Sequence, residues 1–313
     1  MTTKAPPRSA PWAFAAPWGA RGYLCDLDGP VHWIELGSPG RQTGTPIVFV
    51  HGLGGSHLNW CLVGSRLAAD RRAVALDLHG FGLTPGDRFT ATVQRNATLL
   101  DRFIREVTGS PVILVGNSMG GLISILHAAR APDTVRGLVL IDPALPLPAR
   151  APDRQVGGQF LLYALPGLGE LYVRTVLARQ PPQLAVRRVI ELCFADPSRA
   201  DPAMLVASTA LAAERRGWDH ADASLLAASR SLLRVVGRRR RYWEMMAAVR
   251  APVLLIGGQA DRLVPEAAMR HAAARNPRWE MVMLPGVGHT PQLEVPDSVI
   301  GTLRGWLGRH CAS

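Results

Sequence analysis

The chain has 313 residues, 48% of them hydrophobic, and a formal net charge of +11. It can therefore bury a large core, yet no apolar run reaches the length needed to span a membrane. Lys4 is the only lysine among the 35 basic residues, which leaves 34 arginines. Such an excess of arginine over lysine is typical of a bias in genomic base composition. The sequence has no basic motif interleaved with aromatic residues, which would indicate a nucleic-acid partner. The one basic cluster, Arg238–Arg241, is interpreted as a solvated helix face, with attraction of an acidic substrate or lipid headgroup as the alternative.

The chain begins with a segment rich in Pro and Ala, residues 1–20, for which we predict an extended arm. It lacks a continuous apolar stretch, so we do not expect a cleaved signal peptide. A β-hairpin is predicted near residues 22–37. A buried strand predicted at 46–50 leads into the glycine-rich segment His51–Gly55, in which backbone amides can turn inward. The N–H of Leu53 is therefore one predicted donor of an oxyanion hole, worth roughly 3–4 kcal/mol.

The most informative segment is Gly-Asn-Ser-Met-Gly at residues 116–120, between an apolar β-branched run and a segment rich in Ala and Leu. That order predicts a strand near 112–116, a sharp turn and a helix, which together form a nucleophile elbow. The flanking glycines allow the tight turn, and a strained backbone would hold the hydroxyl of Ser118 in the open. The Met119 amide begins the helix beside it and is the second predicted oxyanion donor.

Strands are also predicted near 73–77 and 137–142, and the second of these ends at Asp142. The alternation of strands and helices then stops until about residue 250, and the intervening segment is helical in pattern and interrupted by prolines. Its most apolar patch consists of Phe160, Leu161, Tyr163, Leu165, Leu168, Leu171 and Tyr172. We interpret this patch as packing onto the main domain; an acyl-binding wall or a surface that meets lipid is the alternative.

Two further apolar runs, near 252–257 and 280–284, are predicted strands, and a titratable residue follows each. Asp261 comes just past the first, at the carboxyl edge where ligand chemistry collects in open α/β sheets. His289 falls in a glycine-rich loop after the second. Ser118, Asp261 and His289 thus follow three strands in the order of a nucleophile, an acid and a base.

Five segments together resemble the α/β-hydrolase superfamily. They are HGLGG at 51–55, DLHGFGLT at 77–84, GNSMGG at 116–121, GGQADRLVP at 257–265 and GVGHTPQLEVP at 286–296. The resemblance runs from about Tyr23 to Leu307 and implies an α/β-hydrolase fold with a mostly parallel central sheet flanked by helices, and no cofactor. It implies a hydrolase core at 21–143 and 251–313 and a helical cap at 144–250 that roofs the active site.

The resemblance leaves two positions for the catalytic acid. Some members of the superfamily place it where Asp142 stands, after the strand near 137–142, whereas the commoner arrangement matches Asp261. The other interpretation of Asp142 is that it is simply the polar end of its strand and starts a proline turn. We favour Asp261.

An acyl-enzyme mechanism is implied, and our first hypothesis is a serine carboxylic-ester hydrolase of the esterase or lipase type, acting on a partly apolar small molecule. Ser118 argues against haloalkane dehalogenases and epoxide hydrolases, which use an aspartate at the elbow. GNSMGG is also similar to the elbow of the meta-cleavage-product C–C hydrolases. Leu53 and Thr290 depart from the oxyanion loop and the tryptophan that those enzymes usually carry. Acyl transfer and a non-catalytic ligand receptor on the same scaffold stay open.

The four cysteines show no CxxC motif and no paired spacing, so we predict free thiols in a reducing compartment and a cytoplasmic location. The histidines have no spacing such as HExxH, so no metal site is expected. His51 is expected to hold the oxyanion loop through hydrogen bonds. Contact with a membrane surface is not favoured, and the sequence leaves the oligomeric state open.

Overall fold

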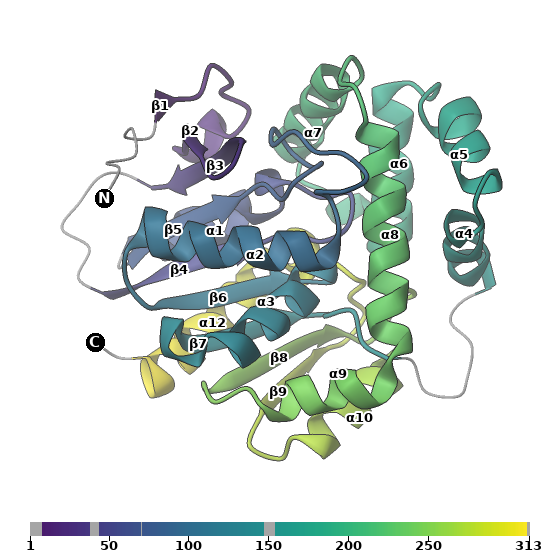
Figure 1. Ribbon diagram of the computed structural model, residues 1–313. Helices are drawn as coiled ribbons and strands as arrows, with labels where there is room; N and C mark the ends of the chain where they lie inside the picture. Colours follow the sequence, from purple (N-terminus) through teal and green to yellow (C-terminus); the bar gives the residue numbers. More distant parts are fainter. Residues whose placement is uncertain (1–7, 38–43, 70, 147–153, 312–313) are drawn as a thin grey trace.

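The structure is a computed structural model that describes residues 8–37, 44–69, 71–146 and 154–311, with the backbone alone at 154–156. Within these residues a nine-stranded sheet forms the centre of the molecule (Figure 1). Its strands are β1 (Arg8–Ser9), β2 (Arg21–Asp26), β3 (Pro30–Leu36), β4 (Gly44–Val50), β5 (Arg71–Leu76), β6 (Val112–Asn117), β7 (Val135–Ile141), β8 (Val253–Gly258) and β9 (Glu280–Leu284). They lie in the order β1-β2-β3-β5-β4-β6-β7-β8-β9.

The sheet is antiparallel at one end and parallel over the rest. Strands β1, β2 and β3 pair antiparallel with one another, and β3 pairs antiparallel with β5. From β5 through β4, β6, β7 and β8 to β9 every pairing is parallel. This arrangement confirms the predicted α/β-hydrolase fold with a mostly parallel sheet. Because the carboxyl ends of parallel strands meet at one edge, the residues that follow β4 to β9 gather there.

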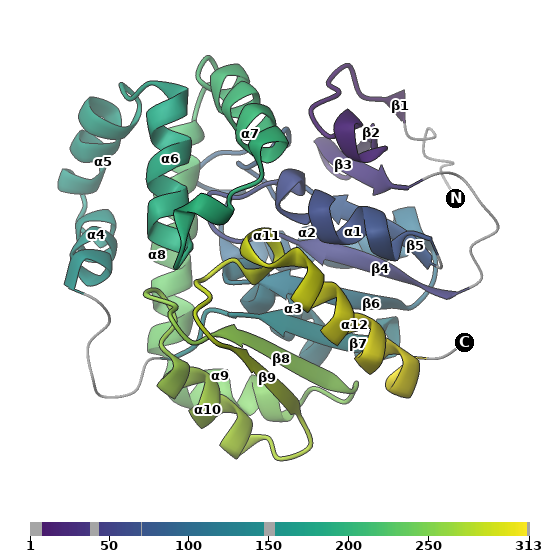
Figure 2. The same cartoon turned by 180° about the vertical axis from the view of Figure 1, so that it is seen from behind.

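Helices cover both faces of the sheet because the parallel strands are apolar on both faces. In β4, Ile47 and Phe49 belong to one buried cluster, and Val48 and Val50 belong to the other. Helices α2 (Val93–Phe103), α3 (Met119–Arg130), α9 (Arg239–Ala247) and α10 (Glu266–Arg275) contribute to the second of these clusters. Helices α1 (Cys61–Leu67) and α12 (Pro296–His310) contribute to the first (Figure 2).

Between β7 and β8 the described secondary-structure elements are all helical. The helices are α4 (Arg154–Ala164), α5 (Leu168–Tyr172), α6 (Pro182–Cys193), α7 (Pro202–Arg215), α8 (Ala221–Gly237) and α9. Helices α4 to α8 lie beyond the carboxyl ends of the parallel strands in both views (Figures 1 and 2), and we call them the cap helices. Helix α9 returns to the sheet, where Tyr242 is fully buried and donates a hydrogen bond to the Ala144 carbonyl at 2.6 Å. Residues 147–153 of the predicted cap lie outside the described residues.

The described part of the N-terminal arm docks on the body of the protein. Strand β1 pairs with β2, and the indole N–H of Trp12 donates to Glu214 at 3.2 Å. The Trp12 ring also lies 6.1 Å from that of Trp218. The sequence left the course of this arm open, and residues 1–7 lie outside the described residues. The arm thus joins the antiparallel end of the sheet to the cap helix α7.

Candidate active site

Ser118 occupies the sharp turn between β6 and α3 that the sequence predicts. Its backbone has φ 54° and ψ −119°, a region that non-glycine residues rarely adopt. The turn needs glycine on both sides because a Cβ on Gly116 would lie 2.6 Å from the Gly120 carbonyl oxygen. A Cβ on Gly120 would lie 2.1 Å from the oxygen of Val50. The elbow is therefore held by close contact with β4, and the Ser118 side chain is left partly exposed.

The two predicted oxyanion donors lie on either side of this turn. Met119 begins α3, where the first N–H groups of a helix have no partner within the helix. Leu53 lies in the loop after β4, between Gly52 and Gly54. A Cβ on Gly52 would lie 3.0 Å from the Cβ of Ser118, so the loop passes directly against the nucleophile. The backbone can therefore approach the serine this closely only because residue 52 is glycine.

His51 braces the same loop from behind. Its Nδ1 donates to the Gly52 carbonyl at 2.7 Å, and its Nε2 accepts from the Leu78 amide at 3.1 Å. Complete burial lowers the pKa of His51 to about 4, so the ring is neutral near pH 7 and keeps both roles. These two hydrogen bonds support the structural function expected of His51.

His289 and Asp261 form a buried pair. The Nδ1 of His289 lies 2.7 Å from Oδ2 of Asp261. The other carboxylate oxygen, Oδ1, accepts from the amides of Leu263 at 2.7 Å and Val264 at 3.1 Å. Because a carboxylate only accepts hydrogen bonds, the proton of the neutral ring resides on Nδ1 and leaves the Nε2 lone pair unprotonated. That is the tautomer a general base requires.

Asn117 ties this pair to the elbow. Its side-chain amide donates to the carbonyl of His289 at 3.1 Å and to that of Ile141 at 3.0 Å. No hydrogen bond joins Ser118 Oγ to His289 within the described residues. Hydrogen bonds of this kind are often loose before substrate binds. The structure thus brings the nucleophile loop and the base loop together through the residue that precedes Ser118.

Asp142 lies directly behind Asp261, so the two acids that the sequence offered as alternatives are neighbours. Strands β7 and β8 are paired, and each acid follows the end of one of them. Both oxygens of Asp142 accept from the Gly258 amide, at 3.1 and 3.2 Å. Burial, and then the charge of Asp261, raise the pKa of Asp142 well above its ordinary value. Asp142 is therefore the acid that loses its proton less readily, and Asp261 is the acid that contacts His289.

A buried carboxylate for which the sequence predicted no role, that of Glu294, holds this region together. Glu294, buried at the end of the short helix α11 (Pro291–Glu294), accepts from the amides of Gly288 at 2.8 Å and Ala195 at 3.1 Å. The guanidinium of Arg199 pairs with it at 3.1 Å. Glu294 thus binds the loop of His289 to the segment after α6. Its place five residues after the predicted base was the only signal available in the sequence.

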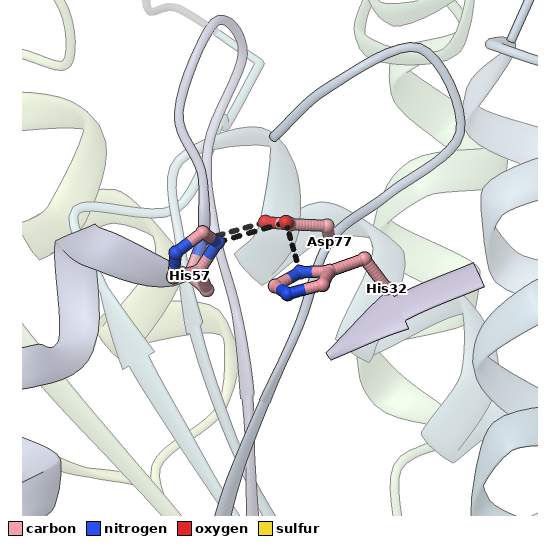
Figure 3. Close-up of side chains that lie close together, drawn as sticks. All are labelled: His32, His57 and Asp77. Atoms are coloured by element: carbon pink, nitrogen blue, oxygen red, sulfur yellow. Dashed lines mark hydrogen bonds and ion pairs between the residues drawn. The ribbon is translucent and has the colours of Figure 1, made fainter. Parts of the chain in front are cut away.

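A second buried histidine–carboxylate cluster was missed because its members are far apart in the sequence (Figure 3). His32 on β3 and His57 in a 3-10 helix (His57–Trp60) each place Nδ1 2.8 Å from Oδ2 of Asp77. The Leu83 amide donates to the same oxygen at 2.8 Å, and the His57 amide donates to Oδ1 at 2.6 Å. Burial alone would raise the pKa of Asp77, but the charge and hydrogen bonds of the histidines hold it well below its ordinary value.

Both clusters bring three potential metal-ligand atoms within 4.8 Å of one another. In the Asp77 cluster each imidazole uses Nδ1 to donate a proton to the carboxylate, and backbone amides take further positions on the same oxygens. In the other cluster Asp261 is occupied by His289 and by two amides. Hydrogen bonding thus accounts for the donor atoms of both sets, and we assign no metal to either.

Comparison with known proteins shows the family to which the chain belongs. The model of the alpha/beta hydrolase family matches residues 47–302, and the chain belongs to this family of enzymes.

Among the relatives, the acetyltransferase component of the acetoin cleaving system of Pseudomonas putida is 30% identical over 281 residues, which are 90% of this chain and 67% of that protein. The (lyso)-N-acylphosphatidylethanolamine lipase of Homo sapiens is 35% identical over 118 residues, which are 36% of this chain and only 34% of the lipase. The crystal structure of a membrane phospholipase A matches with a TM-score of 0.74 and 26% identity, covering 95% of this chain and 88% of that one.

Proposed function

We propose that the protein is a serine hydrolase that cleaves carboxylic esters through an acyl-enzyme intermediate. The observation that carries the proposal is the buried His289–Asp261 pair, joined through Asn117 to a serine in the strained conformation of a nucleophile elbow. A serine hydroxyl needs a base to take its proton and a third group to orient that base. Lipases among the relatives and structural neighbours support the same class of reaction.

The first half of the reaction forms the acyl-enzyme. Nε2 of His289 takes the Ser118 proton as Oγ attacks the ester carbonyl carbon. The N–H groups of Leu53 and Met119 stabilise the tetrahedral oxyanion. His289 then gives its proton to the alcohol oxygen as the C–O bond breaks and the alcohol leaves. Asp261 stabilises the imidazolium throughout.

The second half of the reaction hydrolyses the acyl-enzyme and restores the free enzyme. Water loses a proton to His289 as it attacks the acyl carbonyl, and the released Ser118 Oγ takes that proton back when the acid departs. Asp142, whose pKa is raised by burial and by the charge of Asp261, takes part in none of these proton transfers. One carboxylate therefore carries the charge of the site while its neighbour stays neutral, which keeps like charges from opposing each other.

The test is turnover of p-nitrophenyl esters from acetate to palmitate by the wild type and by Ser118→Ala. We expect the variant to lose all measurable turnover and labelling by a fluorophosphonate probe while its melting temperature is retained. Ser124→Ala is the matched control, because Ser124 lies on α3, just after the turn of Ser118, and its hydroxyl donates to the Gly120 carbonyl at 2.8 Å. Near-normal turnover by Ser118→Ala would refute the proposal.

Acyl transfer is the second candidate, favoured by the relative that is named as an acetyltransferase component. Acyl transfer proceeds through the same acyl-enzyme and differs from hydrolysis only in the nucleophile that attacks it. Adding alcohols or thiols to the ester assay separates the two, because a transferase forms the new ester or thioester in preference to the free acid. Turnover of a dienoate ring-fission product with weak ester hydrolysis would instead assign C–C bond hydrolysis, and stoichiometric binding without turnover would assign a receptor.

A further inference from the structure

Two cap helices form an apolar corner at the outer edge of the molecule. Helix α4 leads into α5, which continues as a π-helical turn at Val173–Leu177. The segments Gly157–Ala164 and Leu168–Leu177 are bent by 113°. No single helix in the described ranges has the length and apolar composition to cross a bilayer, although this bent pair together meets both requirements. Both views show α4 and α5 as the elements farthest from the sheet on the cap side (Figures 1 and 2).

The inner side of the corner packs on α8. Tyr163 and Val173 form a small buried cluster with Leu226. The guanidinium of Arg230 donates to the carbonyls of Tyr163 at 3.0 Å and Leu165 at 3.2 Å, and it pairs with Glu170 at 2.7 Å. These contacts fix the shape of the bend, so the corner is a rigid projection and not a pair of loose helices. They also show that the predicted apolar patch packs inward through only part of its residues.

The outer side of the corner is apolar and exposed. Five large side chains there are between 41 and 62% exposed. They are Leu161, Leu165, Leu168, Leu171 and Val176, and we call them the leucine face. Leu161 lies on α4, Leu165 follows its last residue, and Leu168 and Leu171 share one side of α5. A soluble surface rarely gathers this much apolar area on one projection unless a partner covers it.

The charge around the leucine face identifies the partner. Among residues 157–193 the acidic side chains are Glu170 and Glu191, and each is paired with an arginine. Arg174, Arg179 and Arg188 are exposed and form no ion pair with the described residues. The segment that carries the leucine face thus combines exposed apolar side chains with three exposed arginines, in a chain of net charge +11. Anionic lipid offers the complementary order, with hydrocarbon below negative headgroups.

We propose that the leucine face inserts into the interface of an anionic lipid bilayer and holds the protein on the membrane surface. Insertion is shallow, roughly 5–10 Å, because the opposite side of the same helices is occupied by α8. A convex corner suits a fluid bilayer better than the flat or concave face of a folded partner. The arginine stems lie along the acyl boundary, and their heads reach the phosphates. This proposal goes beyond the proposed reaction and does not depend on it.

The test uses the full chain carrying Ser118→Ala, so that no lipid is consumed. Flotation is measured with vesicles of phosphatidylcholine mixed with phosphatidylglycerol and with vesicles of phosphatidylcholine alone. We expect binding to the anionic vesicles, weakened as salt rises from about 0.15 M to 1 M because screening shortens the reach of the arginines. The double substitution Leu165→Ser and Leu168→Ser should lower vesicle binding about tenfold or more, because both side chains lose their apolar contact. Val206→Ser is the matched control, because Val206 is exposed on α7 outside the leucine face.

Two further readouts keep the outcomes distinct. With Ser118 intact, the leucine variants should hydrolyse a soluble short-chain ester at the wild-type rate, so loss of docking and loss of catalysis are separable. Equal vesicle binding by the double variant and by Val206→Ser would overturn the proposal, as would no binding to either kind of vesicle. A dimer in solution that the double substitution dissociates would also overturn it, because the face would then belong to a second copy of the chain.

Discussion

Two buried clusters in this molecule join histidine Nδ1 to aspartate Oδ2 at almost the same distance, 2.7 Å for His289–Asp261 and 2.8 Å for the pairs on Asp77. They differ in what surrounds the pair. Asp77 accepts from two histidine rings and two backbone amides, and burial lowers the pKa of His32, whose Nε2 has no partner among the described residues. His289 lies next to a strained serine, and a second acid stands behind its carboxylate. Whether a buried histidine–aspartate pair is a candidate general base therefore depends on the residues that surround it.

The largest expected effect separates the two carboxylates by activity. Asp261→Asn should lower kcat by about 10⁴-fold with little change in the melting temperature, because the amide no longer enforces the tautomer with a free Nε2. The measurement is ester hydrolysis together with thermal unfolding. If kcat fell less than that of Asp77→Asn per folded molecule, the assignment of the two clusters would be reversed.

Asp77→Asn should act on stability instead. In the variant, an amide NH₂ group would face N–H donors whose hydrogen bonds the wild-type carboxylate accepts. We expect a loss of about 3–5 kcal/mol in the free energy of unfolding, as for a broken buried pair. Denaturant titration measures this loss. Turnover per folded molecule should stay near the wild-type value, and a variant of unchanged stability would contradict the role given to the cluster.

Lowering the pH should weaken the fold through histidines that are buried in the neutral form. The pKa of His51 falls from 6.5 to about 4 through burial, and that of His32 is lowered by the same cause. The unfolded chain therefore binds protons below about pH 6.5 that the folded chain refuses, so stability declines as the pH falls from there to about 4. For His51 alone the full effect is about 3 kcal/mol. Calorimetry across this range checks it, and a flat melting temperature would contradict it.

The smallest effect is expected at the second acid of the candidate active site. The raised pKa of Asp142 favours its neutral form, and a neutral amide in its place can still accept from Gly258. Asp142→Asn should therefore change kcat by less than about tenfold. The same ester assay measures it. A loss as large as that of Asp261→Asn would make Asp142 the acid that serves the base.

The positions of the candidate site residues could be predicted from the sequence where they depend on local order. Ser118, Asp261 and His289 each follow a strand, and apolar runs with glycine-rich ends mark those strands. The contact between Asp142 and Asp261 could not be predicted, because it follows from the pairing of β7 with β8, two strands more than 100 residues apart in the sequence.

The Asp77 cluster could not be predicted from the sequence for the same reason. Its three members come from three different elements, and no motif links residues 32, 57 and 77. The arm was predicted as extended, but its pairing with β2 was not, because a two-residue strand has no periodicity to detect. The leucine face was only partly anticipated. Hydropathy marks the patch as apolar but does not tell which side chains turn toward α8.

The contacts around Glu294 have a mechanical consequence. The His289 amide donates to the Cys193 carbonyl at 2.6 Å, and Glu294 binds the residues on either side of this contact. The end of α6 and the loop of the imidazole therefore move as one piece. If the end of α6 moved away from the sheet, the contact through Cys193 would draw the His289 loop with it, so we expect that opening at this edge and bond cleavage do not occur at the same time.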